Sequence, residues 1–193
     1  MEGAGRGGGA LAWYLGLLER QPLPTKMVTA GFISVGGDTI CQLGVEHRTQ
    51  VDKMRSLRFF MLGSCLTAPW YHLWFAALAW RIPGAGLVAG LKKMTVDQLV
   101  MPHVFNPLYM AVLMALEARL HLWLPTMQDG YLEMLKANWL LWVPCQLVNF
   151  GLVPMPLQVL FMNSVSVVWV CYLSWTNSAV EAAAMADITT EKG

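Results

Sequence analysis

Long stretches without a formally charged side chain divide the sequence into segments of membrane-spanning length. Phe59–Trp80 and Gln98–Leu116 contain no Asp, Glu, Lys or Arg, and Met27–Val45 contains only Asp38. A helix needs about 20 apolar residues, each rising about 1.5 Å, to cross roughly 30 Å of hydrocarbon. Each of these three stretches therefore predicts one membrane-spanning helix.

The longest stretch without a charge, Ala137–Val180, is too long for one helix. A Pro-Met-Pro run that begins at Pro154 divides it, because proline lacks the backbone N–H donor and crowds the preceding turn. The division predicts two further spans, Ala137–Val153 and Leu157–Trp175. Pro144 lies inside the first of them and is a second candidate for a helix break, so the sequence predicts four or five spans.

Shorter segments between and before the spans predict helices at the membrane surface. Ala10–Arg20 carries leucines on one side and ends in charged residues, and Met127–Lys136 combines apolar positions with three charges. Residues 1–10 are glycine-rich and predict a flexible N-terminus, residues 11–178 a single membrane-embedded domain, and residues 179–193 a frayed tail. The predicted fold class is an all-α integral membrane helical bundle of four or five spans with short interfacial helices.

Composition supports a lipid environment. Hydrophobic residues make up 56% of the chain and charged residues 13%, about half of the roughly 25% typical of soluble domains. A water-soluble fold of this size would have too few polar side chains to cover its surface, whereas a surface that faces lipid needs none. The net charge of +1, from 13 basic and 12 acidic residues, gives no electrostatic grip on nucleic acid.

The sequence indicates no enzyme, no cofactor and no metal site. Its histidines and cysteines lack the spacings of metal sites, and no nucleophile can be paired with a base. His72, between aromatic residues, is interpreted as a hydrogen-bonded interior histidine rather than a ligand. The expected partners are the lipid bilayer and small polar solutes, with a homo-oligomer as a further option.

The first predicted span has one small, polar face. On a helical projection, Asp38 and Gln42 fall within an arc of about 140° that also holds small residues. A carboxylate at the bilayer centre costs about 2.5–3.5 kcal/mol on insertion scales, so Asp38 must face a cation, a water-filled cavity or helix N-termini, or be protonated. Two interpretations stay open: a pore or gate residue, or a buried hydrogen-bonded anchor that fixes helix register.

Three other predicted spans also carry polar residues. Asp97 marks the start of the third span, where it suits either a helix entry or a pore mouth. Gln146 and Asn149 lie three residues apart and so share one helix face, as do Asn163 and Ser166 on the last span. Such amides and hydroxyls either bind helices together or line a path. The shared interior predicted by these stripes is partly polar, and in lipid such an interior commonly holds water.

Several motifs resemble those of the Mpv17/PMP22 family of small organellar membrane proteins, over roughly residues 11–176. They are Thr29-Ala30-Gly31 with Gly37-Asp38, Leu91-Lys92-Lys93-Met94 with Asp97-Gln98, Trp142-x-Pro144-x-Gln146-x-x-Asn149-Phe150-x-x-Val153-Pro154, and Trp169-x-x-Tyr172-Leu173-Ser174-Trp175.

The resemblance implies a protein of the mitochondrial inner membrane or the peroxisome, usually with four spans, that forms a weakly selective gated channel for small solutes. The positions carried over from the family are Asp38, Asp97, Pro144, Gln146, Asn149 and Pro154. From the residues and the resemblance together, we expect a channel with a role in mitochondrial homeostasis. Asp38 would then gate or select, Asp97 support the pore mouth, and Gln146 and Asn149 organise the interior. The alternatives are a peroxisomal location and a non-conducting protein that stabilises a membrane complex.

Overall fold

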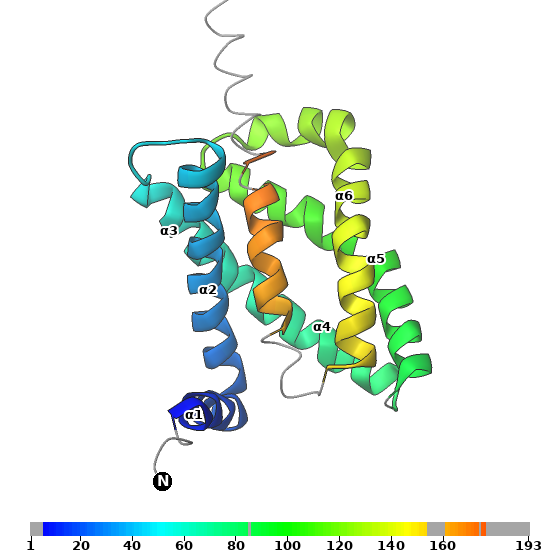
Figure 1. Ribbon diagram of the computed structural model, residues 1–193. Helices are drawn as coiled ribbons and strands as arrows, with labels where there is room; N and C mark the ends of the chain where they lie inside the picture. Colours follow the sequence, from blue (N-terminus) through cyan, green and yellow to red (C-terminus); the bar gives the residue numbers. More distant parts are fainter. Residues whose placement is uncertain (1–5, 85, 154–160, 174, 177–193) are drawn as a thin grey trace, which may run out of the picture.

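Figure 1 shows a computed structural model in which helices pack side by side. The structure describes residues 6–84, 86–153, 161–173 and 175–176. Within these residues there is no β-strand, which confirms the all-α fold class. The helices are α1 (Arg6–Arg20), α2 (Pro22–Ile40) with a π-helical turn (Cys41–Val45), α3 (Lys53–Met61) with a π-helical turn (Leu62–Thr67), α4 (Ala68–Arg81), α5 (Leu87–Leu116), a 3₁₀ turn (Leu120–Leu122), α6 (Trp123–Gly151) and a further apolar helix (Phe161–Leu173).

Two of the described helical segments are long and apolar enough to cross a membrane by themselves, Pro22–Val45 and Leu87–Leu116. The helix Phe161–Leu173 is apolar but shorter. The stretch Lys53–Arg81 is helical throughout but opens with a charged turn, and the first part of α6 carries charges as well. The helical segments thus agree with the predicted ones, while the number of four or five spans stays a prediction.

The predicted helix break at Pro144 is not observed, because α6 runs through this residue to Gly151. A proline inside a helix removes one hydrogen bond to the carbonyl four residues earlier, here that of Leu140. Leu140 is 82% exposed, so the ring lies on the outer side of the helix, and packing of α6 along α5 holds the helix together. Pro154, the other predicted break, lies outside the described residues, as does the predicted tail 179–193.

The N-terminal helix lies across one end of α2 (Figure 1). Prolines occupy the first turn of α2, where the missing N–H has no helical partner to lose. The Tyr14 hydroxyl donates to Thr29 Oγ1 at 3.4 Å, and Thr25 Oγ1 donates to the Leu17 carbonyl at 3.2 Å. These bonds tie α1 to α2 at the place predicted for an interfacial helix. Helix α1 begins at Arg6, earlier than the Ala10 predicted from the sequence.

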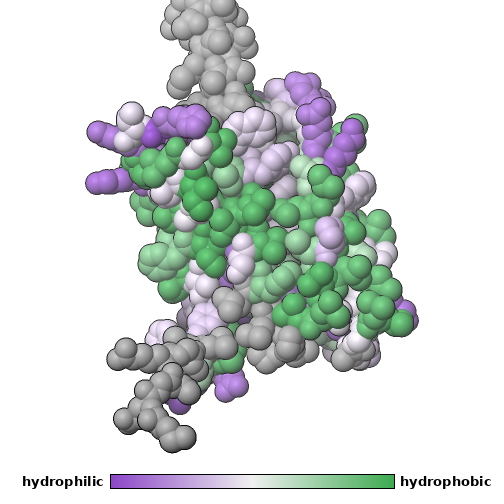
Figure 2. All heavy atoms as spheres, in the orientation of Figure 1, coloured by the Kyte–Doolittle hydropathy of each residue, from purple (hydrophilic) through white to green (hydrophobic). Residues whose placement is uncertain are grey.

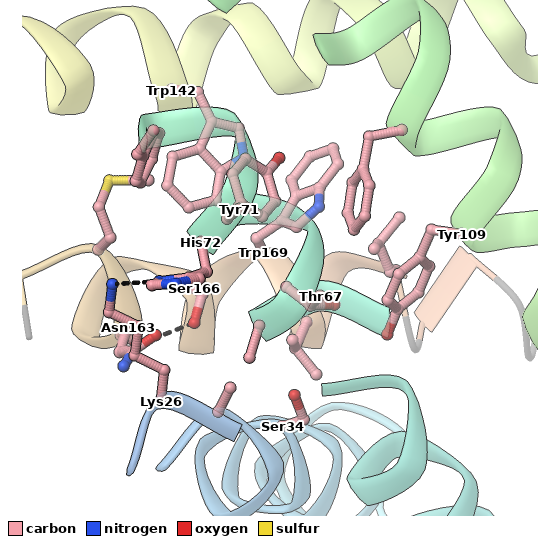
Figure 3. Close-up of a pocket in the computed structure, with 17 residues that line it drawn as sticks. Lys26, Ser34, Thr67, Tyr71, His72, Tyr109, Trp142, Asn163, Ser166 and Trp169 are labelled. Carbon is pink, nitrogen blue, oxygen red and sulfur yellow. Dashed lines mark hydrogen bonds between the residues drawn. The ribbon is translucent and has the colours of Figure 1, made fainter. Parts of the chain in front are cut away.

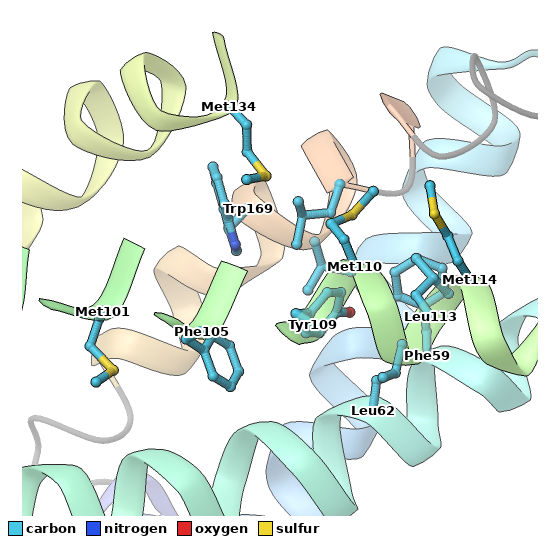
Figure 4. Packing of buried hydrophobic residues seen from close by; sticks show 12 residues of the cluster. Phe59, Leu62, Met101, Phe105, Tyr109, Met110, Leu113, Met114, Met134 and Trp169 are labelled. Atoms are coloured by element: carbon cyan, nitrogen blue, oxygen red, sulfur yellow. The ribbon is translucent and has the colours of Figure 1, made fainter. Parts of the chain in front are cut away.

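The apolar core centres on α5 and is drawn in Figure 4. Its fully buried side chains come from α3, the second π-helical turn, α5 and the helix Phe161–Leu173, and α6 packs against them. The largest are Phe59, Leu62, Met110, Leu113, Met114 and Leu173. Helix α2 packs against the turn Leu62–Thr67 at glycine contacts, where Ser64 Oγ donates to the Met27 carbonyl at 2.9 Å.

A broad hydrophobic band covers the middle of the molecule (Figure 2). Hydrophilic residues gather at its ends, most of them at the end that carries α3 and the start of α6. Large exposed apolar side chains come from α2 with its π-helical turn, from α5 and from α6: Val28, Phe32, Ile40, Leu43, Leu99, Val104, Leu140 and Val148. A soluble monomer rarely exposes so much contiguous apolar surface, and lipid is the solvent that matches it.

Candidate functional site

Asp38 is the centre of a buried ion-pair cluster between α2 and α3. Arg55 Nε lies 2.9 Å from Asp38 Oδ1, while Ser56 Oγ and Gln42 Nε2 donate to Oδ2 at 2.9 and 2.7 Å. The exposed fraction is 0% for Asp38 and 4% for Arg55. The other nitrogens of the guanidinium donate to both carboxylate oxygens of Glu46, at 2.6 and 3.0 Å. We call Asp38, Gln42, Glu46, Arg55 and Ser56 the Asp38 cluster.

Local sequence fixes how α3 presents Arg55 to the Asp38 cluster. Asp52 caps α3 by accepting the backbone N–H groups of Met54 and Arg55, each at 3.0 Å. The Asp52 N–H donates in turn to Gln42 Oε1 at 2.6 Å, which joins the cap to the end of α2. The π-helical turn at Cys41–Val45 carries Gln42 in this position. Cap, turn and cluster therefore form one connected network at the polar end of the molecule.

Arg55 supplies the cation that the burial of Asp38 requires. An arginine guanidinium is not deprotonated in proteins, and here it donates hydrogen bonds to the carboxylates of both Asp38 and Glu46. The guanidinium thus stays charged. Asp38 also lies only about two turns before Val45, near the end of the helix rather than at its middle. This geometry is that of the buried anchor, one of the two interpretations of Asp38; a pore or gating role stays a prediction.

Asp97 organises a second polar cluster, between α4, α5 and α6. Trp74 Nε1 donates to Asp97 Oδ1 at 2.7 Å, and Gln98 Nε2 and Gln146 Nε2 donate to Oδ2 at 2.8 and 3.1 Å. Asn149 Nδ2 continues the chain to Gln146 Oε1 at 3.3 Å. Three of the predicted site residues are thus brought together: Asp97, Gln146 and Asn149. We call Trp74, Asp97, Gln98, Gln146 and Asn149 the Asp97 cluster.

The amides of the Asp97 cluster extend further between α5 and α6. Asn138 Nδ2 donates to Gln98 Oε1 at 3.2 Å, and Asn106 Nδ2 donates to Asn138 Oδ1 at 3.0 Å. The free space beside these groups is about 10 Å³, enough for about one water molecule. The polar stripes of α5 and α6 therefore meet as predicted, and they satisfy one another by direct hydrogen bonds.

A larger cavity of about 90 Å³ lies between α2, α4, α5, α6 and the helix Phe161–Leu173 (Figure 3). None of the predicted pore residues lines it. Its walls are mostly aromatic and aliphatic, and the polar side chains along them are Lys26, Ser34, Thr67, Tyr71, His72, Tyr109, Asn163 and Ser166. In Figure 3, Lys26, His72 and Asn163 lie together at one side, and Tyr109 lies at the opposite side.

Two buried polar atoms in this cavity have no hydrogen-bond partner among the described residues, the Tyr109 hydroxyl and Asn163 Nδ2. Tyr109 is 4% exposed. An unpaired polar group in apolar surroundings costs about 1–3 kcal/mol, and such groups in native proteins are normally met by water or a ligand. We call this space, with its two unpaired groups, the central cavity.

Sequence reasoning missed Arg55, Lys26 and Tyr109. Arg55 lies 17 residues after Asp38, in a predicted connection, and the only signal was a basic side chain in what proves to be the first turn of α3. Lys26 was visible only as a charge before the first span. The tyrosine gave no signal, because a buried aromatic residue in an apolar helix ordinarily belongs to the core. Asn163 and Ser166 were predicted as a polar stripe, and His72 as a hydrogen-bonded interior histidine.

Comparison with known proteins decides which family this architecture belongs to. The sequence profile of the Mpv17/PMP22 family matches residues 114–174. Protein sym-1 of Neurospora crassa is 34% identical over 86% of this chain and 98% of its own length. This chain belongs to the Mpv17/PMP22 family. The resemblance predicted from the motifs is thereby confirmed.

Other members of the Mpv17/PMP22 family match over similar lengths. Peroxisomal membrane protein 2 of Bos taurus is 31% identical over 86% of this chain and 88% of its own. PXMP2/4 family protein 2 of Dictyostelium discoideum is 32% identical over 83% and 87%. No solved structure matches the chain. The relatives therefore share most of the helical unit described above, including the segments that form both polar clusters.

Proposed function

We propose that this Mpv17/PMP22 family protein is an organellar membrane protein whose helical bundle provides a weakly selective, gated path for small polar solutes. The observation that carries the proposal is the central cavity, where the Tyr109 hydroxyl and Asn163 Nδ2 face free space without a partner. Buried polar groups of this kind need water or a solute beside them. A bundle with free space between five helical segments already holds part of a path.

The location in a membrane is supported by the hydrophobic band of Figure 2 and by the two helical segments of spanning length. In a bilayer, backbone polar groups must be satisfied within the chain, and helices do so. We propose four or five spans, with the Lys53–Arg81 stretch, the later part of α6 and the helix Phe161–Leu173 completing the set. The α1 helix would then lie at the interface.

We place the path along the central cavity rather than past Asp38. The Asp38 carboxylate accepts from Arg55, Ser56 and Gln42 and is fully buried, so it offers no surface to a passing solute. The Asp97 carboxylate accepts from Trp74, Gln98 and Gln146, and Asn149 donates to Gln146, although Asp97 and Gln146 border the small second cavity. In this proposal both clusters hold the helices in register around the path.

Filling the central cavity is expected to reduce conduction. Ser166 lines the cavity, and Val168 on the same helix is 59% exposed and faces away from the core. In planar bilayers, we expect Ser166→Phe to lower unitary conductance at least severalfold, because the ring occupies space that water needs. The matched control, Val168→Phe, should conduct as the parent protein does. Equal conductance in the two variants would place the path elsewhere, and silent recordings from the parent protein would refute conduction itself.

A second candidate function is a non-conducting protein that stabilises a membrane complex. The observation in its favour is that the Asp38 and Asp97 clusters pair internally, as a bundle with no continuous aqueous path would require. This second function predicts different experimental results from the first. Bilayer recordings would be silent, and a stable partner would co-purify with the parent protein.

The organelle is proposed as the mitochondrion, with the peroxisome as the alternative. The mitochondrial proposal rests on the family resemblance of the sequence motifs. Peroxisomal membrane protein 2 of Bos taurus is named for the other organelle, which supports the alternative. We expect the full-length protein, tagged at either end, to co-fractionate with inner-membrane markers of mitochondria. Co-fractionation with peroxisomal markers alone would overturn the mitochondrial assignment.

A further inference from the structure

The central cavity has a cation at one side, and none of its lining residues in the described part of the chain carries a carboxylate. Lys26 Nζ lies 3.0 Å from His72 Nδ1. An ammonium group can only donate, so His72 accepts through an unprotonated Nδ1 and is neutral in this arrangement. Within residues 6–84, 86–153, 161–173 and 175–176, no carboxylate lies within ion-pair distance of Lys26. The positive charge of Lys26 is therefore matched there by a neutral imidazole alone.

Besides the Lys26 ammonium group, the cavity contains two hydrogen-bonding groups that have no partner among the described residues, Asn163 Nδ2 and the Tyr109 hydroxyl. Asn163 Nδ2 is a donor, and it lies on the same side of the cavity as Lys26 in Figure 3. The Tyr109 hydroxyl, which can donate or accept, lies on the opposite side. Between them the wall is aromatic, from Tyr71, Phe105 and Trp169 among others. An anionic oxygen head and an apolar body together match this distribution of groups.

The size of the cavity limits the body of such a ligand. Its volume is about 90 Å³, whereas an engineered cavity that binds benzene measures about 150 Å³. The ligand portion inside the cavity is therefore smaller than a benzene ring, which corresponds to a tail of only a few carbons. Inorganic anions would leave the aromatic wall without a partner, and long acyl chains would not fit inside.

We propose that the central cavity binds a short-chain monocarboxylate, with its carboxylate at Lys26 and Asn163 and its alkyl tail among the aromatic rings. The inference rests on the proposed function, since it names the solute class for the same cavity. Two charge-assisted contacts hold the head, and burial of the tail supplies the remaining affinity. Lys26 sets selectivity for the anion, and the aromatic wall sets the length of the tail.

The test is calorimetric titration of the full-length protein in detergent with acetate, butyrate and decanoate, and with 1-butanol as the uncharged probe. We expect butyrate to bind tighter than acetate, because its tail reaches the apolar wall, and 1-butanol to bind at least tenfold weaker. Equal binding of butyrate and butanol would refute the anion site. Binding of decanoate alone would overturn the short-chain class and indicate a fatty acid that enters from the lipid.

Variants distinguish a direct contact between Lys26 and the carboxylate of the ligand from an effect of the protein's overall positive charge. Lys26→Gln is expected to weaken butyrate binding at least tenfold, while Lys92→Gln, which removes an exposed lysine from α5 outside the cavity, should leave it unchanged. Asn163→Leu, a second variant on another helix, should also weaken binding, so the test survives a folding defect in one protein. Unchanged affinity in both cavity variants would overturn the proposal.

The same preparations distinguish this inference from the proposed function. Butyrate binding that depends on Lys26, together with silent bilayer recordings, would leave a ligand site and remove the path. Conduction that Ser166→Phe blocks, without any butyrate binding, would retain the path and overturn the solute class.

Discussion

Replacing Arg55 with methionine is expected to destabilise the protein by about 3–5 kcal/mol, the usual consequence of removing one partner of a buried ion pair. The variant would leave Asp38, which is fully buried, without its cation and would also release Glu46. The measurement is denaturant unfolding of the purified protein in detergent micelles. The matched control is Arg48→Met, because Arg48 is 41% exposed and its pairing with Glu46 faces solvent. That control should lose no more than about 1 kcal/mol.

A double-variant cycle isolates the coupling between the two charges. Asp38→Asn combined with Arg55→Met is expected to cost clearly less than the sum of the two single changes, because position 38 then carries no charge and Glu46 keeps its contact with Arg48. Additive costs would show that Asp38 and Arg55 act separately, and would count against the anchor interpretation of Asp38. A loss below about 1 kcal/mol in Arg55→Met alone would contradict it directly.

Gly63→Ala is expected to be the most disruptive single-methyl addition among the glycines described. A Cβ at Gly63 would lie 2.6 Å from the Ala30 carbonyl oxygen and 2.9 Å from its carbonyl carbon, both backbone atoms of α2. Backbone atoms cannot move aside as the end of a side chain does, so α2 and the turn Leu62–Thr67 would have to separate. Overpacking of this kind costs about 1–3 kcal/mol, which thermal unfolding would detect.

Gly36→Ala is the matched control for Gly63→Ala. Gly36 also lies in α2, and a Cβ there would meet nothing within 4 Å. Alanine at a helical glycine in open space is expected to raise stability by up to about 1 kcal/mol, through lower backbone entropy in the unfolded chain. A Gly63→Ala protein as stable as Gly36→Ala would show that the helices tolerate a wider separation than the contact suggests.

The helices of this fold were predictable because charge gaps and prolines mark where a segment can enter apolar surroundings. The stretches 27–45, 59–80 and 98–116 are all helical in the structure. Their ends were less predictable, since α5 begins at Leu87 and includes Lys92 and Lys93 in its early turns. Charged side chains at a helix end reach polar surroundings by their own length, so a charge does not have to end a helix.

Pro144 was misread as a break, and the two π-helical turns were not predicted at all. Proline in a helix interior is costly in isolation, but tertiary packing can outweigh local preference. The turn Cys41–Val45 lies where α2 meets α3. The turn Leu62–Thr67 packs against α2. Contacts between segments far apart in the sequence cannot be seen in a linear hydrophobic pattern, which therefore gave no sign of these turns.

The sequence predicted which polar residues belong to the candidate site better than it predicted which of them contact one another. Gln146 and Asn149 share one face of α6, as expected from their spacing, and Gln146 also reaches Asp97 on α5, a contact that the sequence did not predict. The partner of Asp38, however, comes from the following helix, and pairing across a connection depends on the register of two helices rather than on spacing in one. The central cavity is defined by five segments, so no stretch of sequence could have revealed its volume or its unpaired groups.

The Asp38–Arg55 pair also constrains how such a chain is made. Because α2 leaves the ribosome before α3, the nascent α2 helix at first carries the Asp38 carboxylate without its cation. Inserting this helix alone into the hydrocarbon of a membrane would cost free energy. Only when Arg55 has emerged can the two charges cancel. We infer that the stretches Pro22–Val45 and Lys53–Arg81 insert into the bilayer together as a helical hairpin, with the connection capped by Asp52 at its tip.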